Sequence, residues 1–307
     1  MRIAVMGAGG IGSFYGGLLA RAGEDVTFIA RGAHLAALRA GGLEVLRDLE
    51  RFTVHPVQAT DDPAAVGPVE LVLLATKAYD LEAALEAMAP LVGPESLVLP
   101  LLNGVDMVQR VARRVPAGQV LAGLTYVPAN RPRPGAVHQP GPERRLLLGE
   151  PRGPATERCR RVLAVLEGAG IRAEVSDAMP VELWSKFMLV TANGGVCGVT
   201  GSPIGPVLAD PDTRALYIAC CREVQALAAA LGVALPPDAV QRTVAHAEGT
   251  PADNRPSLLQ DLEQGKPLEL EALNGTVARL GRARGVPVPV NAFIAAALKL
   301  RAGGRSP

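Results

Sequence analysis

A single lysine begins the longest uncharged part of this sequence. No Asp, Glu, Lys or Arg follows Lys186 until Asp210. Burial removes water from an ammonium group, which lowers its pKa and makes it a better proton donor near neutral pH. The pattern therefore favours Lys186 as a general acid. A lysine that reaches solvent from a buried helix is the alternative.

Two further polar residues are expected near a substrate. At about 100° per residue, Asn193 falls within about 20° of Lys186 on one helix face. In a predicted helix over 268–284, Glu269 lies at the border of the apolar stripe, whereas Glu271 points to water. The Glu269 carboxylate is either buried and paired, or placed in a first turn where the helix dipole favours it.

A predicted helix start lies between these two candidates. Ser257 and Gln260 have the spacing of a capping box, which would explain the serine structurally. The same helix start could receive a substrate carboxylate, and Asn254 would supply a further donor. Both interpretations remain open.

The N-terminal residues form a dinucleotide-binding pattern. A buried-strand run over 3–6 leads directly into six residues that connect it to a predicted helix, namely Gly7, Ala8, Gly9, Gly10, Ile11 and Gly12. In such turns the first glycine bends the chain, the second lets the backbone approach the pyrophosphate, and the third allows close packing of strand and helix. Gly7, Gly9 and Gly12 fit these roles.

Three residues that follow predicted strands are candidates for cofactor or substrate contacts. Arg31 stands where NAD-preferring proteins usually carry a carboxylate, and its guanidinium could bind a 2′-phosphate, so NADP(H) is favoured over NAD. Lys77 and Asn103 each follow a later strand. An exposed surface arginine or lysine and an ordinary Asn-Gly turn are the alternatives.

The elements that would hold these residues change in type along the chain. Strands and helices alternate up to residue 176, which predicts an α/β Rossmann-like domain over 1–176. After residue 177 only helical periodicity remains, which predicts an all-helical domain over 177–307, with a ligand cleft between the two. Strands are expected at 3–6, 26–30, 71–76, 97–101, 120–124, 145–148 and 171–175, a hairpin at 43–46 and 52–54, and helices at 180–193, 211–231, 257–264, 268–284 and 290–301.

Composition excludes several classes of protein. A net charge of +1 disfavours nucleic-acid binding. No export signal or membrane span is visible, and the four cysteines lack a Cys-x-x-Cys pair, so a cytoplasmic protein with reduced thiols is expected. The four histidines share no metal-ligand spacing, so no metal is expected. Oligomeric state stays open, and a homodimer is compatible with the sequence.

Taken together, these motifs resemble the ketopantoate reductase (2-dehydropantoate 2-reductase) family. The resemblance rests on the glycine turn, Arg31, Asn103-Gly104, Trp184-Ser185-Lys186, and the run from Ser257 to Asp261 followed by Glu269 and Asn274-Gly275. It implies NADPH-dependent reduction of ketopantoate to pantoate, in pantothenate and coenzyme A synthesis.

The same resemblance implies a role for each candidate residue. Lys186 would protonate the ketone oxygen, and Glu269 would orient the substrate hydroxyl or the product. Asn103 would contact substrate and nicotinamide, Lys77 would lie at the cofactor, and Ser257 and Asn254 would hold the carboxylate side of the substrate. The chain departs from the family at Val190 and Gly194, where asparagine is frequent; Asn193 is offset by one position.

Two alternatives to ketopantoate reduction follow from the residues. The protein could reduce another branched 2-oxo acid, which a substrate panel would reveal. It could also be an NADP-binding sensor without turnover, although the presence of both Lys186 and Glu269 argues against a sensor.

Overall fold

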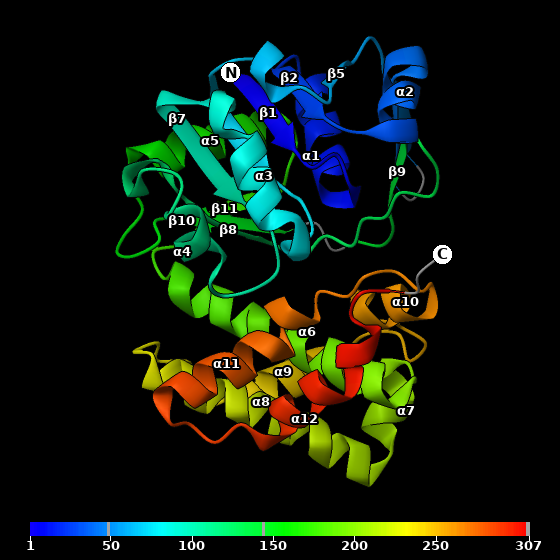
Figure 1. Ribbon diagram of the computed structural model, residues 1–307, viewed down its shortest axis with the longest axis vertical. Helices are drawn as coiled ribbons and strands as arrows, with labels where there is room; N and C mark the ends of the chain where they lie inside the picture. Colours follow the sequence, from blue (N-terminus) through cyan, green and yellow to red (C-terminus); the bar gives the residue numbers. More distant parts are fainter. Residues whose placement is uncertain (48–49, 143–144, 305–307) are drawn as a thin grey trace. The chain divides into compact units, whose positions relative to one another are not determined.

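The computed structural model describes residues 1–47, 50–142 and 145–304. The chain divides into two compact units, which can be followed in Figure 1 by the colours that mark position in the sequence. Unit 1 comprises Met1–Leu102 and Asp106–Met179, and unit 2 comprises Asn103–Val105 and Pro180–Pro307. Each unit has its own hydrophobic core. The short stretch Asn103–Val105 thus belongs with the helical part of the chain.

Unit 1 is built on a parallel sheet of five strands in the order β5-β2-β1-β6-β7. Its strands are rich in buried Val, Ile and Leu, as expected for a sheet covered on both faces. In Figure 1, helix α3 lies in front of this sheet and α5 behind it. The predicted Rossmann-like fold is confirmed. The strands are β1 (Arg2–Met6), β2 (Asp25–Ile29), β5 (Gln58–Thr60), β6 (Val69–Leu74) and β7 (Val92–Pro100).

Two smaller sheets complete the strands found in the described part of unit 1. One has the order β11-β10-β8 and the other β4-β3-β9. The predicted hairpin is confirmed as the antiparallel pair β3–β4. Sequence periodicity missed the short strands β5 and β9. The strands are β3 (Leu43–Arg47), β4 (Glu50–Val54), β8 (Ala122–Thr125), β9 (Ala136–Gln139), β10 (Leu146–Gly149) and β11 (Ala173–Val175).

The helices of unit 1 cover these sheets. The first of them, α1, buries every residue from Gly12 to Leu19, and its glycines permit close packing. A Cβ at Gly16 would lie 2.5 Å from the Phe28 ring of β2. The helices are α1 (Gly10–Arg21), α2 (Gly32–Gly41), α3 (Leu81–Ala87), α4 (Met107–Val111) and α5 (Glu157–Gly168).

Unit 2 contains helices and no strand in its described residues, as predicted. Two helices were missed. Helix α7 has only six residues and includes Gly205 and Pro206, whereas α9 presents a narrow stripe of small residues to the core. The helices are α6 (Met179–Thr200), α7 (Ile204–Ala209), α8 (Pro211–Ala230), α9 (Ala239–Glu248), α10 (Ser257–Glu263), α11 (Asn274–Arg284) and α12 (Pro289–Leu298).

The predicted continuous helix over 268–284 is wrong. A 3₁₀ turn spans Leu270–Ala272, and α11 begins only at Asn274. The chain leaves helical conformation at Leu273 (φ −107°, ψ −106°). Glu269 therefore lies before the helix, and the helical wheel used to orient its side chain does not apply.

Three glycines of α6 allow neighbouring parts of unit 2 to pack closely against this helix. A Cβ at Gly194 would lie 3.2 Å from Leu258 Cβ, and one at Gly198 would lie 2.8 Å from the same leucine. A Cβ at Gly195 would lie 2.6 Å from the amide of Asn274. Because these three residues have no side chain, α10 and α11 can approach α6, the helix that carries Lys186.

Candidate functional site

The predicted dinucleotide turn has the geometry that its glycines require. Gly7 adopts φ +100°, a conformation that residues with side chains rarely take. A Cβ at Gly12 would lie 2.1 Å from the carbonyl oxygen of Gly7, so only glycine lets the helix pack against the turn. Gly9, in contrast, has nothing within 4 Å of its Cβ position. Its open side leaves room for a ligand to approach the backbone.

The end of the turn offers donors to an anion. Gly9 is the N-cap of α1, its helix start has no side-chain cap, and no acidic residue stands in the first turn. Free N–H groups at a helix N-terminus bind phosphate well. Beside Gly7, Thr76 Oγ1 is buried and has no hydrogen-bond partner among the described residues. These features fit the pyrophosphate of a dinucleotide.

Sequence reasoning missed the structural role of Gly10. A Cβ there would lie 2.2 Å from the carbonyl oxygen of Ala129, in the loop between β8 and β9. The contact is remote in sequence, so no local pattern reveals it. Gly10 is thus required by packing within unit 1, whereas Gly9 faces open space.

This difference gives a matched pair of variants. We expect Gly10→Ala to lower the free energy of unfolding by roughly 2 kcal/mol, because backbone atoms must shift. Gly9→Ala should leave the melting temperature unchanged but weaken dinucleotide binding, because the new methyl group enters the ligand side. Thermal melts and fluorescence titration with NADPH measure the two effects. Equal melting temperatures for both variants would contradict the packing role of Gly10.

A buried histidine, His34, connects the dinucleotide turn to Gly135 through hydrogen bonds. The backbone N–H of Gly135 donates to His34 Nδ1 at 3.0 Å, and His34 Nε2 lies 3.4 Å from Ser13 Oγ. Ser13 Oγ donates to the carbonyl of Ala8 at 3.0 Å. Burial, reinforced by the charge of Arg131, lowers the pKa of His34 to about 4. The ring is therefore neutral at physiological pH and links the turn to residue 135.

The two predicted basic cofactor contacts take different positions in unit 1. Arg31 is the N-cap residue of α2, and its exposed side chain makes no hydrogen bond or ion pair with the described residues. It is thus available to a ligand. Lys77 follows β6, precedes a 3₁₀ turn over Ala78–Asp80 and is half-buried.

In unit 2, three residues predicted separately come together. Lys186 Nζ donates to Asn103 Oδ1 at 3.0 Å, and Asn103 Nδ2 donates to Glu269 Oε2 at 3.4 Å. Lys186 is 8% exposed and Glu269 is 6% exposed. In the sequence, Asn103 precedes Lys186 by 83 positions and Glu269 by 166 positions. Asn103 therefore connects an ammonium and a carboxylate.

Burial sets the electrostatics of this cluster. Loss of water lowers the pKa of Lys186 to about 8, and the negative charge of Glu269 partly opposes that shift. An ammonium with this pKa keeps its proton near neutral pH and releases it readily. It can therefore protonate an oxygen on which negative charge develops, as in the reduction of a ketone.

The other residues predicted to contact the substrate, Asn193, Asn254 and Ser257, differ in exposure and in hydrogen bonding. Asn193 Oδ1 accepts a hydrogen bond at 2.7 Å from Tyr217, whose side chain is fully buried. Asn254 is half-buried, and its backbone carbonyl accepts from Ile204 N–H at 3.0 Å. Ser257 is exposed at the first position of α10.

The capping box predicted at Ser257 and Gln260 is wrong. Pro256 occupies the N-cap position, and the helix start has no side-chain cap. The Gln260 side chain instead donates to the carbonyl of Arg255 at 2.6 Å. Capping therefore does not explain the serine.

A buried amide network in unit 2 was not predicted. Asn274 Nδ2 donates to Asn291 Oδ1 at 2.9 Å and to the carbonyl of Thr191 at 3.5 Å. Glu223 accepts from the backbone N–H groups of Val290 and Asn291 at the start of α12. Because Thr191 lies on α6, the network holds α11 and α12 against the helix that carries Lys186.

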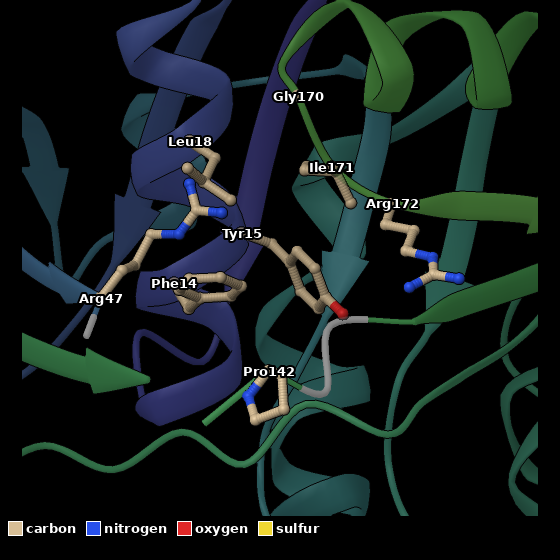
Figure 2. A pocket seen from close by; sticks show the side chains of 8 residues that line it. All are labelled: Phe14, Tyr15, Leu18, Arg47, Pro142, Gly170, Ile171 and Arg172. Atoms are coloured by element: carbon tan, nitrogen blue, oxygen red, sulfur yellow. The ribbon is translucent and has the colours of Figure 1, made fainter. Parts of the chain in front are cut away.

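A separate hollow of about 230 Å³ opens in unit 1 beside α1. Figure 2 shows Phe14 and Tyr15 projecting from α1, with Arg47 above Phe14. The Arg47 guanidinium carbon lies 5.9 Å from the centre of the Phe14 ring. None of the residues predicted to bind cofactor or substrate lines this hollow, which is formed by Phe14, Tyr15, Leu18, Arg47, Pro142, Gly170, Ile171 and Arg172.

No group of three or more His, Cys, Asp or Glu side chains in the described residues is arranged to hold a metal ion. No described helix is long and apolar enough to cross a membrane. The four cysteines are free and buried.

A dinucleotide turn on a parallel sheet and a buried lysine in a helical unit are features of oxidoreductases, and comparison with known sequences specifies the family. The family described as "Ketopantoate reductase PanE/ApbA" matches residues 3–153, and its C-terminal counterpart matches residues 179–302. The chain therefore belongs to the ketopantoate reductase family, and it is an oxidoreductase.

Individual relatives agree with this assignment along the whole chain. A 2-dehydropantoate 2-reductase from Mesorhizobium japonicum is 33% identical over 98% of each chain. The crystal structure of a family ketopantoate reductase from Ralstonia eutropha is 35% identical, with a TM-score of 0.91 over 98% of each chain. The family fold is also that of a D-mandelate dehydrogenase solved with NADH, 25% identical with a TM-score of 0.87 over 98% of this chain and 99% of that one.

Proposed function

We propose that this protein reduces 2-dehydropantoate (ketopantoate) to pantoate with NADPH as the reductant. The observation that carries the proposal is the buried cluster of Lys186, Asn103 and Glu269 in a member of this family. The named relatives catalyse a reaction of this class. The reaction would serve pantothenate and coenzyme A synthesis in the cytoplasm.

Unit 1 would hold the cofactor. The glycine turn Gly7–Gly12 would cradle the pyrophosphate, and Arg31 would pair with the 2′-phosphate that distinguishes NADPH from NADH. Lys77 would lie at the cofactor. When bound, NADPH supplies the hydride that reduces the ketone.

Unit 2 would supply the proton. Lys186 has three N–H donors, and one of them is held by Asn103 at 3.0 Å. Another would donate to the ketone oxygen and transfer its proton as negative charge develops there. The negative charge of Glu269 raises the pKa of Lys186 and so partly offsets the effect of lost hydration on that pKa. Asn254 and Ser257 would contact the carboxylate side of the substrate.

A spectrophotometric assay tests the proposal. Purified protein, NADPH and ketopantoate should give a steady fall in NADPH absorbance, with pantoate formed in equal amount. A protein that binds NADPH but leaves its absorbance unchanged with every 2-oxo acid would instead be a cofactor-binding sensor. The buried lysine–carboxylate cluster favours the enzyme.

The charge of Glu269 leads to a pH prediction. Reduction requires protonated Lys186, so kcat/KM should fall as pH rises through about 8. Because Glu269 raises the pKa of Lys186, Glu269→Gln should move this fall to lower pH. Glu271→Gln, at an exposed position two residues away, is the matched control and should leave the profile unchanged. A profile of Glu269→Gln that matches the wild type would contradict the assigned coupling.

A further inference from the structure

A loop of unit 1 is docked against the starts of two helices. The loop comprises residues 129–135, between β8 and β9. At one end of it, a Cβ at Gly10 of α1 would lie 2.2 Å from the carbonyl oxygen of Ala129. At the other end, the backbone N–H of Gly135 donates to His34 Nδ1 of α2 at 3.0 Å. Because the proposed phosphate contacts lie at these two helix starts, the loop is held beside them.

Both helix starts have features that suit an anion. Neither has a side-chain cap or an acidic residue in its first turn. A Cβ would have nothing within 4 Å at Gly9, the N-cap of α1, or at Gly32, the first residue of α2. Free N–H groups at a helix start bind phosphate. The start of α1 is proposed for the pyrophosphate, so the start of α2, with Arg31 as its N-cap, is open to a second phosphate.

Arg131 brings a positive charge to the start of α2. Its side chain is exposed and makes no hydrogen bond or ion pair with the described residues. Burial and, next in size, the charge of Arg131 lower the pKa of His34 to about 4. Only nearby charges shift a pKa in this way, so the Arg131 guanidinium lies near the His34 ring. That ring belongs to the first turn of α2, three residues after Arg31.

A second arginine of the loop has a structural role instead. Arg133 forms an ion pair with Glu44 of β3, and Glu44 also pairs with Arg51 of β4. The pair between Arg133 and Glu44 fastens the loop to the sheet β4-β3-β9. Arg131, two residues earlier, makes no such contact with the described residues, so the fold does not account for its charge.

We infer that Arg131 is a second specificity-determining residue, which binds the 2′-phosphate of NADPH together with Arg31. The inference rests on the proposed function, because it takes NADPH to bind at the glycine turn. A phosphate monoester carries about two negative charges and three acceptor oxygens, so two guanidinium groups can share it. NADH lacks this phosphate. Arg131 should therefore act on the choice between the two cofactors.

Substitutions at position 131 test the inference through cofactor binding, measured by fluorescence titration without substrate. Arg131→Ala should weaken NADPH binding by about tenfold and leave NADH binding within about twofold of the wild type. Arg131→Lys should fall between alanine and wild type, because an ammonium keeps the charge but loses the paired donors. Arg131→Glu should weaken NADPH binding more than Arg131→Ala, because its carboxylate repels the phosphate.

Arg133→Ala is the matched control from the same loop. Glu44 keeps Arg51 as a partner in this variant, so the protein should fold and keep the wild-type ratio of NADPH and NADH dissociation constants. An unchanged ratio in Arg131→Ala would overturn the inference. Equal weakening of both cofactors would also overturn it, because Arg131 would then act on a part that NADPH and NADH share. If Arg131→Ala does not fold, the lysine and glutamate variants decide in the same way.

The wild-type protein separates this inference from the proposed function. If it reduces ketopantoate and prefers NADPH, while Arg131→Ala keeps that preference, only the inference fails. If it binds NADPH but does not reduce ketopantoate, the proposed function fails, and the titrations still decide the role of Arg131.

Discussion

Replacing Lys186 by alanine is expected to lower kcat for ketone reduction by about 10³-fold, the size of a lost general acid. The ammonium is the proton donor within the buried cluster, and Asn103 and Glu269 cannot replace it, because an amide and an ionised carboxylate hold no comparably acidic proton. NADPH affinity should remain within about twofold of the wild type, because Lys186 belongs to unit 2 and the predicted phosphate contacts belong to unit 1. Steady-state kinetics and a fluorescence titration measure the two quantities.

Two controls sharpen this experiment. Lys299→Ala removes an exposed lysine of the same unit and should leave kcat unchanged. Lys186→Arg keeps a positive charge but removes the readily released proton, because a guanidinium stays protonated. It should therefore remain slow. Near-normal turnover of Lys186→Ala would show that another group donates the proton.

Replacing Arg31 by alanine is expected to weaken NADPH binding by about ten- to a hundredfold, while NADH binding changes little. Charge-assisted hydrogen bonds to a phosphate contribute about this much, and NADH lacks the 2′-phosphate. The Arg31 side chain is exposed and makes no ion pair with the described residues, so its loss should not disturb folding. Titration of both cofactors gives the ratio of dissociation constants.

A second arginine variant tests whether the loss of any positive charge in unit 1 would weaken NADPH binding. Arg113 is also exposed in unit 1, and its side chain makes no bond to the described residues. Arg113→Ala should leave both affinities unchanged. If Arg31→Ala weakened NADH and NADPH equally, Arg31 would not read the 2′-phosphate, and the preference for NADPH would have another origin.

Local signals predicted the dinucleotide turn well. Gly7, Gly9 and Gly12 follow a buried strand directly, so all the information lies within a few residues. The requirement for Gly10 could not be seen, because it arises from Ala129, which is distant in the sequence. Periodicity likewise identified the α/β and all-helical parts but missed short elements such as β5 and α7.

The lysine–carboxylate cluster shows the limit of periodicity more clearly. Burial of Lys186 was predicted from the uncharged run that follows it, and the structure places it inside unit 2. A helical wheel placed Glu269 at the border of the apolar stripe and left its burial as one of two interpretations, but Leu273 breaks that helix. The link through Asn103 depends on a three-residue stretch after β7 that packs with the helical unit. No local pattern contains that information.

Direct titration of Lys186 tests the central claim. The sequence has only four lysines, so a protein labelled with ¹³C at lysine Cε gives few NMR signals, and Lys186→Arg identifies the signal of interest. We predict that this signal titrates near pH 8, at the pH where kcat/KM for ketopantoate reduction falls, and that it shifts when a 2-oxo acid binds. A signal that titrates above about pH 10, as a solvated lysine does, and ignores the 2-oxo acid would contradict the account.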